Sequence, residues 1–303
     1  MTATPSPADP ELARAPLCAG PDPNPRKPRI KLPPLACDSH FHVFGPRSVY
    51  PYSPKRIYTP PDASLASYLK LLGVLGAERM VFVQPSVYGS DNRVMLNAMK
   101  EMGARCRGVA VVDDNVSDAE LERLHAAGVR GVRVNVVDVA EDKGVIPMAP
   151  LRRMAERIRP LGWHVEFLMH ADEFPQLDRL FGDFPVPIVL GHLGYMRTDK
   201  GVAHAGFQAL LSLMREQGAW VKLTGPYRIA VSEMPYPDVT PYAHALVAAA
   251  PGQVIWGTDW PHPKHDKAMP NDGEMCDRLL DWVPDEALRH KVLVENPSRL
   301  YGW

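Results

Sequence analysis

The chain has 303 residues, and its 34 Lys and Arg against 35 Asp and Glu give a formal net charge of -1. This balance excludes the strongly basic or acidic surface with which proteins attract nucleic acid or an anionic membrane. Its four cysteines form no Cys-x-x-Cys pair, there is no secretory signal, and no apolar run reaches the roughly 18 residues of a membrane helix, so we expect a cytoplasmic protein without disulfides.

Residues 1–34 are rich in Pro and Ala and contain few large apolar side chains. Such a segment buries too little apolar surface to offset the entropy that ordering costs. We therefore expect a flexible N-terminal arm at 1–34, followed by a single domain at 35–303. A second interpretation stays open, in which the arm packs on a neighbouring subunit of a homo-oligomer.

Eight short apolar or β-branched runs follow the arm, and each is typical of a buried strand. They lie at residues 35–44, 79–85, 106–113, 129–136, 164–170, 187–193, 219–226 and 253–260. Most are separated by segments with helical periodicity that close on a glycine, as helices often do. The clearest of these segments are 118–128, 149–162 and 207–218.

Eight β–α units with nearly continuous apolar strands predict an α/β fold, the (β/α)8 or TIM barrel. In this fold each strand is covered by helices outside and by side chains inside. A doubly wound open sheet is the alternative, but no Gly-rich phosphate loop follows the first strand.

Polar side chains gather at the predicted carboxyl ends of the strands, where barrels of this kind place their active sites. Since all eight strands run in parallel, these side chains should share one rim of the barrel. They are His40, His42, Gln84, Ser86, Arg133, Asn135, His170, His192, Arg228 and Asp259.

The two histidines of the first strand, His40 and His42, are two residues apart and therefore point to the same side. Two inward imidazoles at this spacing are a common way to hold a divalent metal. Hydrogen-bonded strand histidines are the alternative interpretation.

Asp259 lies near the end of the eighth apolar run, which places it at the predicted rim. A buried carboxylate needs a cation, a metal or hydrogen-bond donors. It could serve as a general base that takes a proton from water, or it could cap the following turn. His170 and His192 each end an apolar run in the same way, and the group as a whole indicates a shared catalytic site.

The motif D-x-H-x-H at residues 38–42, the histidines that end strands five and six, and GTDWPH at 257–262 resemble the amidohydrolase superfamily, in particular its amidohydrolase-2 branch. The segments YSPKRIYTPPDA (52–63), VQPSVYGSDN (83–92) and VIWGTDWPHP (254–263) are similar to the 2-pyrone-4,6-dicarboxylate lactonases and the related sulfomuconolactone hydrolases.

This resemblance implies a barrel hydrolase that opens a lactone bearing negative groups during the breakdown of aromatic compounds. It implies that Asp259 activates water while His40, His42 and His192 surround the scissile carbonyl. It also implies four residues that hold the anionic substrate or line its pocket, namely Arg133, Arg228, Tyr58 and Ser86. Arginine suits this role independently, because its planar fork meets a carboxylate through two hydrogen bonds.

The sequence departs from that family in the histidine of strand five. The pyrone-dicarboxylate lactonases work without a metal and lack this residue, which is His170 here. His40, His42, His170 and Asp259 would offer nitrogen and oxygen ligands for one divalent ion, Zn2+ or a similar metal. Strand four contains no Lys or Glu for a second metal. A metal-free mechanism is the alternative to the one-metal site.

Two other functions remain open at this point. The same branch includes metal-dependent decarboxylases of unsaturated acids, so carbon dioxide release is one alternative. A non-catalytic barrel that binds an anionic metabolite is the other. The second does not explain why a potential base and four imidazoles would share one rim.

Overall fold

The eight predicted strands form one parallel sheet in the order β1-β2-β3-β4-β5-β6-β7-β8. The computed structural model describes residues 14–138 and 145–303. After β8 the chain bonds back to the first strand, through the Asp259 N–H to the His40 carbonyl (2.8 Å) and the His42 N–H to the Trp260 carbonyl (2.8 Å). The strands are β1 (Cys37–Phe41), β2 (Arg79–Val83), β3 (Cys106–Ala110), β4 (Val129–Asn135), β5 (His164–Leu168), β6 (Ile188–Leu190), β7 (Trp220–Leu223) and β8 (Val254–Trp256).

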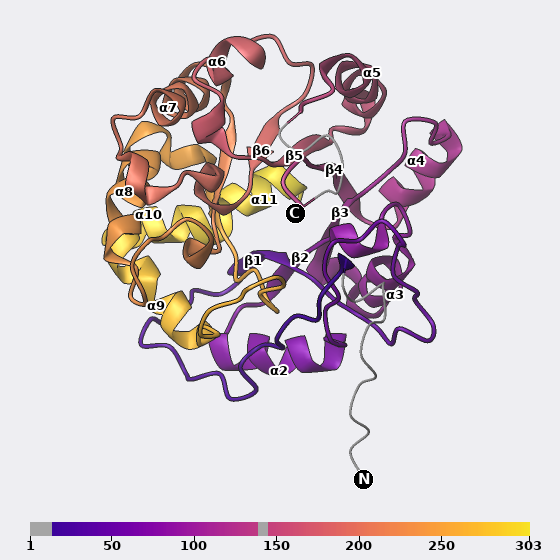
Figure 1. The fold of residues 1–303 in the computed structure, drawn as a ribbon, viewed down its shortest axis with the longest axis horizontal. Coiled ribbons are helices and arrows are strands. Elements are labelled where there is room, and N and C mark those ends of the chain that lie inside the picture. Colours follow the sequence, from indigo (N-terminus) through magenta and orange to yellow (C-terminus); the bar gives the residue numbers. More distant parts are fainter. Residues whose placement is uncertain (1–13, 139–144) are drawn as a thin grey trace.

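Helices surround this sheet as a ring, so that the predicted (β/α)8 barrel is confirmed (Figure 1). The described helices are α2 (Leu65–Leu75), α3 (Arg93–Met102), α4 (Asp118–Ala126), α5 (Met148–Ile158), α6 (Leu177–Leu180), α7 (Ala205–Gln217), α8 (Thr240–Ala249), α9 (Asp272–Trp282), α10 (Glu286–His290) and α11 (Asn296–Tyr301).

Local capping signals account for the helix boundaries. Helix α4 begins where the Ser117 side chain accepts a hydrogen bond from the Glu120 N–H, and the pair forms an S-x-x-E capping sequence. Helix α7 ends at Gly218, whose φ of 69° is the left-handed conformation that favours glycine. Strand β8 is shorter than the predicted run 253–260, because its polar end leaves the sheet to form the rim.

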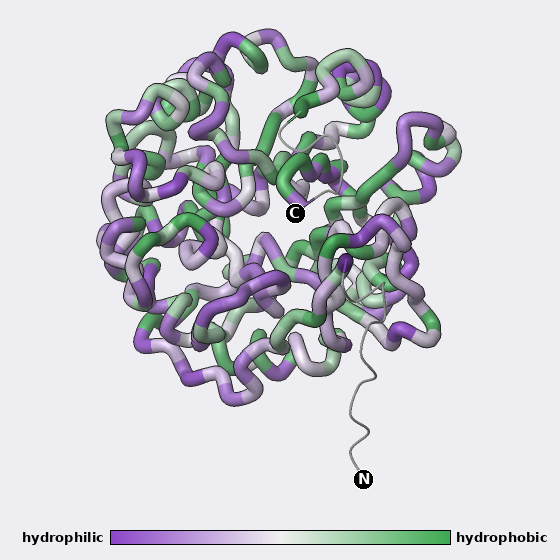
Figure 2. Tube along the Cα trace, in the orientation of Figure 1, coloured by the Kyte–Doolittle hydropathy of each residue, from purple (hydrophilic) through white to green (hydrophobic). Residues whose placement is uncertain are grey.

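The described residues form two main clusters of the hydrophobic core, besides a small group of Val137, Leu168 and Tyr195. The larger lies between the strands and the helices, and hydrophobic stretches alternate with hydrophilic ones around the ring (Figure 2). The smaller lies inside the barrel and contains Val81, Val189, Trp220, Ile255 and Tyr301 among its members. Tyr301 packs edge-on against His164 at the start of β5, with ring centroids 5.4 Å apart. Helix α11 therefore closes the end of the barrel opposite to the predicted site.

Residues 14–34 of the predicted arm run along the barrel, while residues 1–13 lie outside the described residues. The buried Asp277 carboxylate accepts hydrogen bonds from the backbone N–H groups of Arg29 (2.6 Å) and Ile30 (3.1 Å). Further toward the N-terminus, Leu17 forms an isolated parallel β-bridge with Thr59. Within the two described ranges, no helix is both long and apolar enough to cross a membrane.

Candidate active site

His40 of β1 and His42, one residue beyond this strand, lie together inside the carboxyl end of the barrel. The pairing of β1 with β2 shifts in register between Asp38 and Phe41. His40 and His42 are both buried, and their ring centroids are 5.1 Å apart in an edge-on arrangement. The prediction that both histidines point to the same side therefore agrees with the structure.

Asp259 faces these two imidazoles from the segment after β8. It adopts a left-handed φ of 63°, a conformation that Asp tolerates better than most side chains. Two residues earlier, Gly257 packs so closely on β1 that an added Cβ would lie 2.6 Å from the backbone nitrogen of His40. The glycine of the GTD sequence is thus what lets the carboxylate approach the histidines.

The two oxygens of the Asp259 carboxylate have different surroundings. Oδ2 accepts hydrogen bonds from Arg228 Nε (2.7 Å) and the Tyr227 hydroxyl (2.5 Å). Oδ1 is buried without a hydrogen-bond partner among the described residues, 3.5 Å from His40 Nε2 and 3.7 Å from His42 Nε2. Burial by itself would raise the pKa of Asp259, but Arg228 holds it well below the usual range. The carboxylate is therefore anchored by one oxygen and open at the other.

The imidazoles of the site are neutral. Burial lowers the pKa of His40 to about 3, and it also lowers the pKa values of His42 and His192. His42 Nδ1 lies 2.7 Å from the Val83 carbonyl oxygen, which can only accept, so this nitrogen carries the proton. His42 Nε2 therefore presents a lone pair toward Asp259.

A buried ion pair lies behind His40. Lys222 Nζ is 2.7 Å from Glu166 Oε2 and donates to the Ser39 carbonyl at 2.7 Å. His40 Nδ1 lies 3.3 Å from both Lys222 Nζ and Glu166 Oε1. Burial would raise the pKa of Glu166, but the Lys222 ammonium holds it well below the usual range. The pair thus packs a carboxylate and an ammonium directly against the imidazole of His40.

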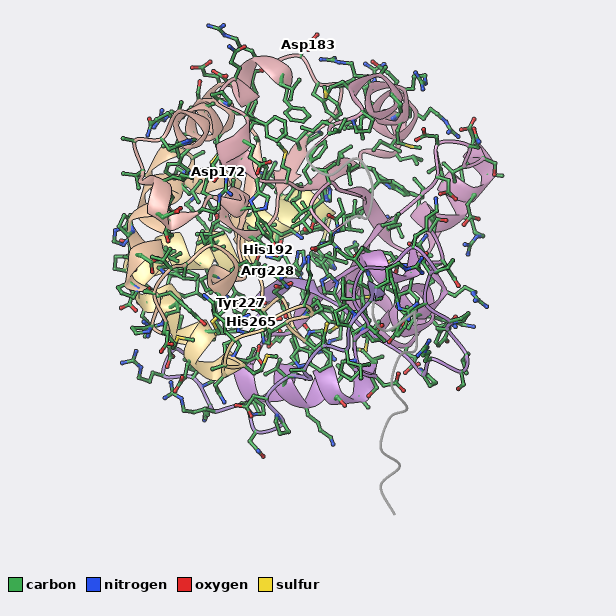
Figure 3. The ribbon with its side chains drawn as sticks, viewed as in Figure 1. Asp172, Asp183, His192, Tyr227, Arg228 and His265 are labelled. Carbon is green, nitrogen blue, oxygen red and sulfur yellow. The ribbon has the colours of Figure 1, made fainter. Side chains whose placement is uncertain are left out.

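His192 joins the site from the end of β6. Its Nδ1 is 3.9 Å from Asp259 Oδ2, and its ring centroid is 4.9 Å from that of His40. The Thr224 hydroxyl lies 2.9 Å from the same Nδ1 and accepts the His192 backbone N–H at 3.1 Å. Figure 3 shows His192 next to Arg228 and Tyr227 near the centre of the molecule.

His40, His42 and Asp259 form a group that could hold a metal ion, since one ligand atom of each lies within 4.8 Å of the others. The donor set of two imidazole nitrogens and one carboxylate oxygen suits zinc with an open position. Two of these atoms, His40 Nε2 and Asp259 Oδ1, are buried without a hydrogen-bond partner among the described residues. The residues therefore fit one divalent ion, although Arg228 and Lys222 already place positive charge beside them.

His170, the fourth predicted ligand, is not part of this group. It lies two residues beyond β5, and its Nδ1 is 3.2 Å from the Tyr195 carbonyl oxygen. It belongs instead to a second group with Asp172 and Glu173, and Asp172 lies away from His192 in Figure 3. The inward position of β5 next to His40 is taken by Glu166.

The predicted anion-binding residues differ in the hydrogen bonds that they already make within the protein. Arg133 donates from Nη1 to the Gln84 carbonyl at 2.9 Å, and its Nε is buried without a partner among the described residues. Arg228 is bound to Asp259. Tyr58 and Ser86 lie together, with their hydroxyl oxygens 3.4 Å apart. Arg133 Nε is thus a donor without a partner in the described part of the chain.

Several residues of the site were not expected from the sequence, chiefly Glu166, Lys222 and Tyr227. Glu166 and Lys222 are charged residues inside apolar strands, and this feature could have been noticed in the sequence. The sequence does not show that the two residues pair across the barrel. Tyr227 also lies 3.0 Å from His262 Nδ1, and Nε2 of this histidine is 3.1 Å from Asp272 Oδ1. Asp272, His262 and Tyr227 thus form a series of polar contacts that ends at the Asp259 carboxylate.

Known proteins are similar to this chain in sequence and in fold. A family model described as amidohydrolase matches residues 37–303. The chain is 44% identical over 287 residues to a 2-pyrone-4,6-dicarboxylate hydrolase of Comamonas testosteroni, covering 92% of this chain and 93% of that protein. It is 40% identical over 298 residues to a 4-sulfomuconolactone hydrolase of Rhizobium radiobacter, covering 98% and 99%. A solved structure of a proposed 2-pyrone-4,6-dicarboxylic acid hydrolase from Pseudomonas putida superposes with a TM-score of 0.79 at 32% identity, covering 89% of this chain and 98% of that one.

Proposed function

We propose that this chain, which belongs to the amidohydrolase family, opens a lactone that carries a carboxylate or sulfonate group. Relatives at 44% and 40% identity are named for hydrolysis of such lactones, one a pyrone dicarboxylate and the other a sulfomuconolactone. The substrate of this chain is therefore a small anionic cyclic ester.

The observation that carries this proposal is the open oxygen of Asp259. Oδ1 is buried, ionised and without a hydrogen-bond partner among the described residues, while Oδ2 is anchored by Tyr227 and Arg228. A carboxylate held in this way is oriented to take a proton from a water molecule on its open side. The water oxygen would then attack the lactone carbonyl.

The neutral imidazole of His192 would stabilise the charge that develops on the carbonyl oxygen. The Thr224 hydroxyl accepts the His192 backbone N–H and is free to donate its own proton to His192 Nδ1. In that arrangement His192 carries its proton on Nε2, from which it would donate to the oxyanion. A fixed donor of this kind stabilises a transition state because it needs no reorganisation during the reaction.

His40, His42 and Asp259 would hold one divalent ion, and zinc is the metal that best suits these ligands. When bound, such an ion polarises an ester carbonyl and lowers the pKa of water. His170 is left out of this ligand set because it lies in a separate group.

The acid groups of the substrate would be bound by Arg133 and Arg228, beside the pocket residues Tyr58 and Ser86. Arg133 Nε has no partner among the described residues, so it is available to an acid group. Arg228 would bind a second acid group only by sharing its guanidinium with Asp259.

Replacement of the base tests this function. Asp259→Asn keeps the shape of the side chain but removes the acceptor charge, and we expect kcat to fall by about 10²–10⁴-fold, the usual contribution of a general base. Hydrolysis is measured on carboxylated, sulfonated and neutral lactones, and circular dichroism checks the fold. Full activity of Asp259→Asn would rule out this assignment. Carbon dioxide release from unsaturated acids, without lactone hydrolysis, would support the decarboxylase alternative instead.

A further inference from the structure

The side-chain amide of Asn135 is held in one orientation at the carboxyl end of β4. Its Oδ1 accepts hydrogen bonds from the backbone N–H groups of Val137 (2.9 Å) and Asp138 (2.8 Å). Only the oxygen of an amide can accept two such bonds, so the amide cannot be flipped. Its Nδ2 must therefore point away from these two donors.

Nδ2 of Asn135 is a buried donor without a hydrogen-bond partner among the described residues. Buried polar groups in native proteins nearly always have a partner, because desolvating a donor without replacing its bond is unfavourable. An unpartnered donor at a rim that binds substrate indicates that the missing acceptor comes from a ligand or an ordered water.

A second free donor lies on the same face of the strand. Side chains two residues apart in a strand point to the same side, so Arg133 and Asn135 face one region. Arg133 Nε is also buried without a partner in the described part of the chain, while its Nη1 is bound to the Gln84 carbonyl. Asn135 is the nearer of the two to the carboxyl end, the end at which such barrels bind substrate.

We propose that Asn135 Nδ2 and Arg133 Nε together bind one acid group of the substrate. This proposal rests on the proposed function, in which the substrate is an anionic lactone. A carboxylate or sulfonate offers at least two acceptor oxygens and no donor, so it satisfies both groups at once. A neutral lactone without an acid group would leave both donors unpaired, and the pair therefore also selects against it.

Two variants isolate the Nδ2 donor from the rest of the Asn135 side chain. Asn135→Asp keeps an oxygen for the N–H groups of Val137 and Asp138 but replaces the donor with a negative oxygen. Asn135→Ser is neutral, and its hydroxyl can still accept a backbone N–H in the turn that follows. Both lack the amide donor, and only the first adds charge.

We expect KM for an anionic lactone to rise about tenfold in Asn135→Ser, which corresponds to about 1.4 kcal/mol of lost binding. The rise should be larger in Asn135→Asp, with the melting temperature of both variants near that of the parent. An unchanged KM in both variants would overturn the proposal. So would a rise confined to Asn135→Asp, because charge repulsion alone would then explain it.

Calorimetric binding of benzene-1,3-dicarboxylate to the full-length protein separates this proposal from the proposed function. Arg133→Met serves as the reference for loss of the neighbouring donor. If the parent protein hydrolyses no lactone but Asn135→Ser binds the dicarboxylate about tenfold more weakly, the proposed function fails and the subsite stands. If the parent hydrolyses anionic lactones and Asn135→Ser binds and reacts normally, the subsite fails alone. A parent protein that neither binds nor hydrolyses contradicts both.

Discussion

Arg228 Nε lies 2.7 Å from Asp259 Oδ2, so the guanidinium that the sequence assigns to the substrate is bound to the proposed base. Its Nη2 also donates to the Pro263 carbonyl at 3.0 Å. Under the proposed function, a substrate anion would meet an Arg228 that is already bonded to Asp259 and to the Pro263 carbonyl. The charge of Arg228 keeps Asp259 ionised, which links substrate binding to the strength of the base.

The pH dependence of activity should report this pairing. The pKa values of Asp259, His40 and His192 all lie below their usual ranges, so we expect kcat/KM to be level between about pH 5 and 8. In Arg228→Met, loss of the positive charge disfavours the ionised carboxylate and raises the pKa of Asp259, which moves the acid limb of the profile to higher pH. Arg228→Lys keeps the charge and should move it less. An acid limb that stays in place in Arg228→Met would contradict this account.

The buried pair of Lys222 and Glu166 should be strongly coupled in stability. Lys222→Met leaves Glu166 as an unpaired buried charge, and we expect a loss of about 3–5 kcal/mol in the free energy of unfolding. The double variant Lys222→Met/Glu166→Leu should recover part of this loss, because both charges are removed together. Urea unfolding of the parent, both single variants and the double variant measures the coupling. Additive losses would show that the two residues do not act as a pair.

Metal content distinguishes the two groups of potential ligands. We expect protein purified without chelators and supplied with zinc to bind about one equivalent through the first group, as a three-ligand site with an open position does. His42→Asn should lose this metal, whereas His170→Asn should retain it. Mass spectrometry of the metal content, together with hydrolysis before and after chelation, provides the measurement. Equal metal loss in both variants would place His170 in the site, and a fully active metal-free protein would show that the imidazoles act on the carbonyl directly.

The contact between the N-terminal segment and Thr59 should affect substrate binding. The Thr59 carbonyl accepts the Cys18 N–H at 2.9 Å, directly beside the predicted pocket residue Tyr58. Deletion of residues 1–18 removes this contact, so we expect KM to rise while kcat changes little. Deletion of residues 1–13 is the matched control, because it leaves the Cys18 contact in place. Identical kinetics of the two truncated proteins would show that the contact does not order the pocket.

Much of the fold could be predicted from the sequence because barrel strands carry a local signal. Each of the eight apolar runs contains a strand, and the rim residues lie either near the carboxyl end of a strand, as His40, Arg133 and Asn135 do, or in the segment that follows it. The amidohydrolase motif at 38–42 predicted the family, and the family match over 37–303 confirms it. His40, His42, His192 and Asp259 come together because each follows or ends a parallel strand.

The sequence by itself thus determined which strands form and which polar residues reach the rim, because strand periodicity and chain direction decide both. Only the tertiary structure decided which of these residues pair. Strand register and barrel closure decide whether Arg228 contacts a substrate or Asp259, whether His170 joins the other histidines, and whether Lys222 pairs with Glu166. Register and closure place atoms of Arg228 and Asp259, and of Lys222 and Glu166, within 3 Å of each other although the residues of each pair are more than 30 positions apart in the chain. No local pattern of residues contains such a long-range contact.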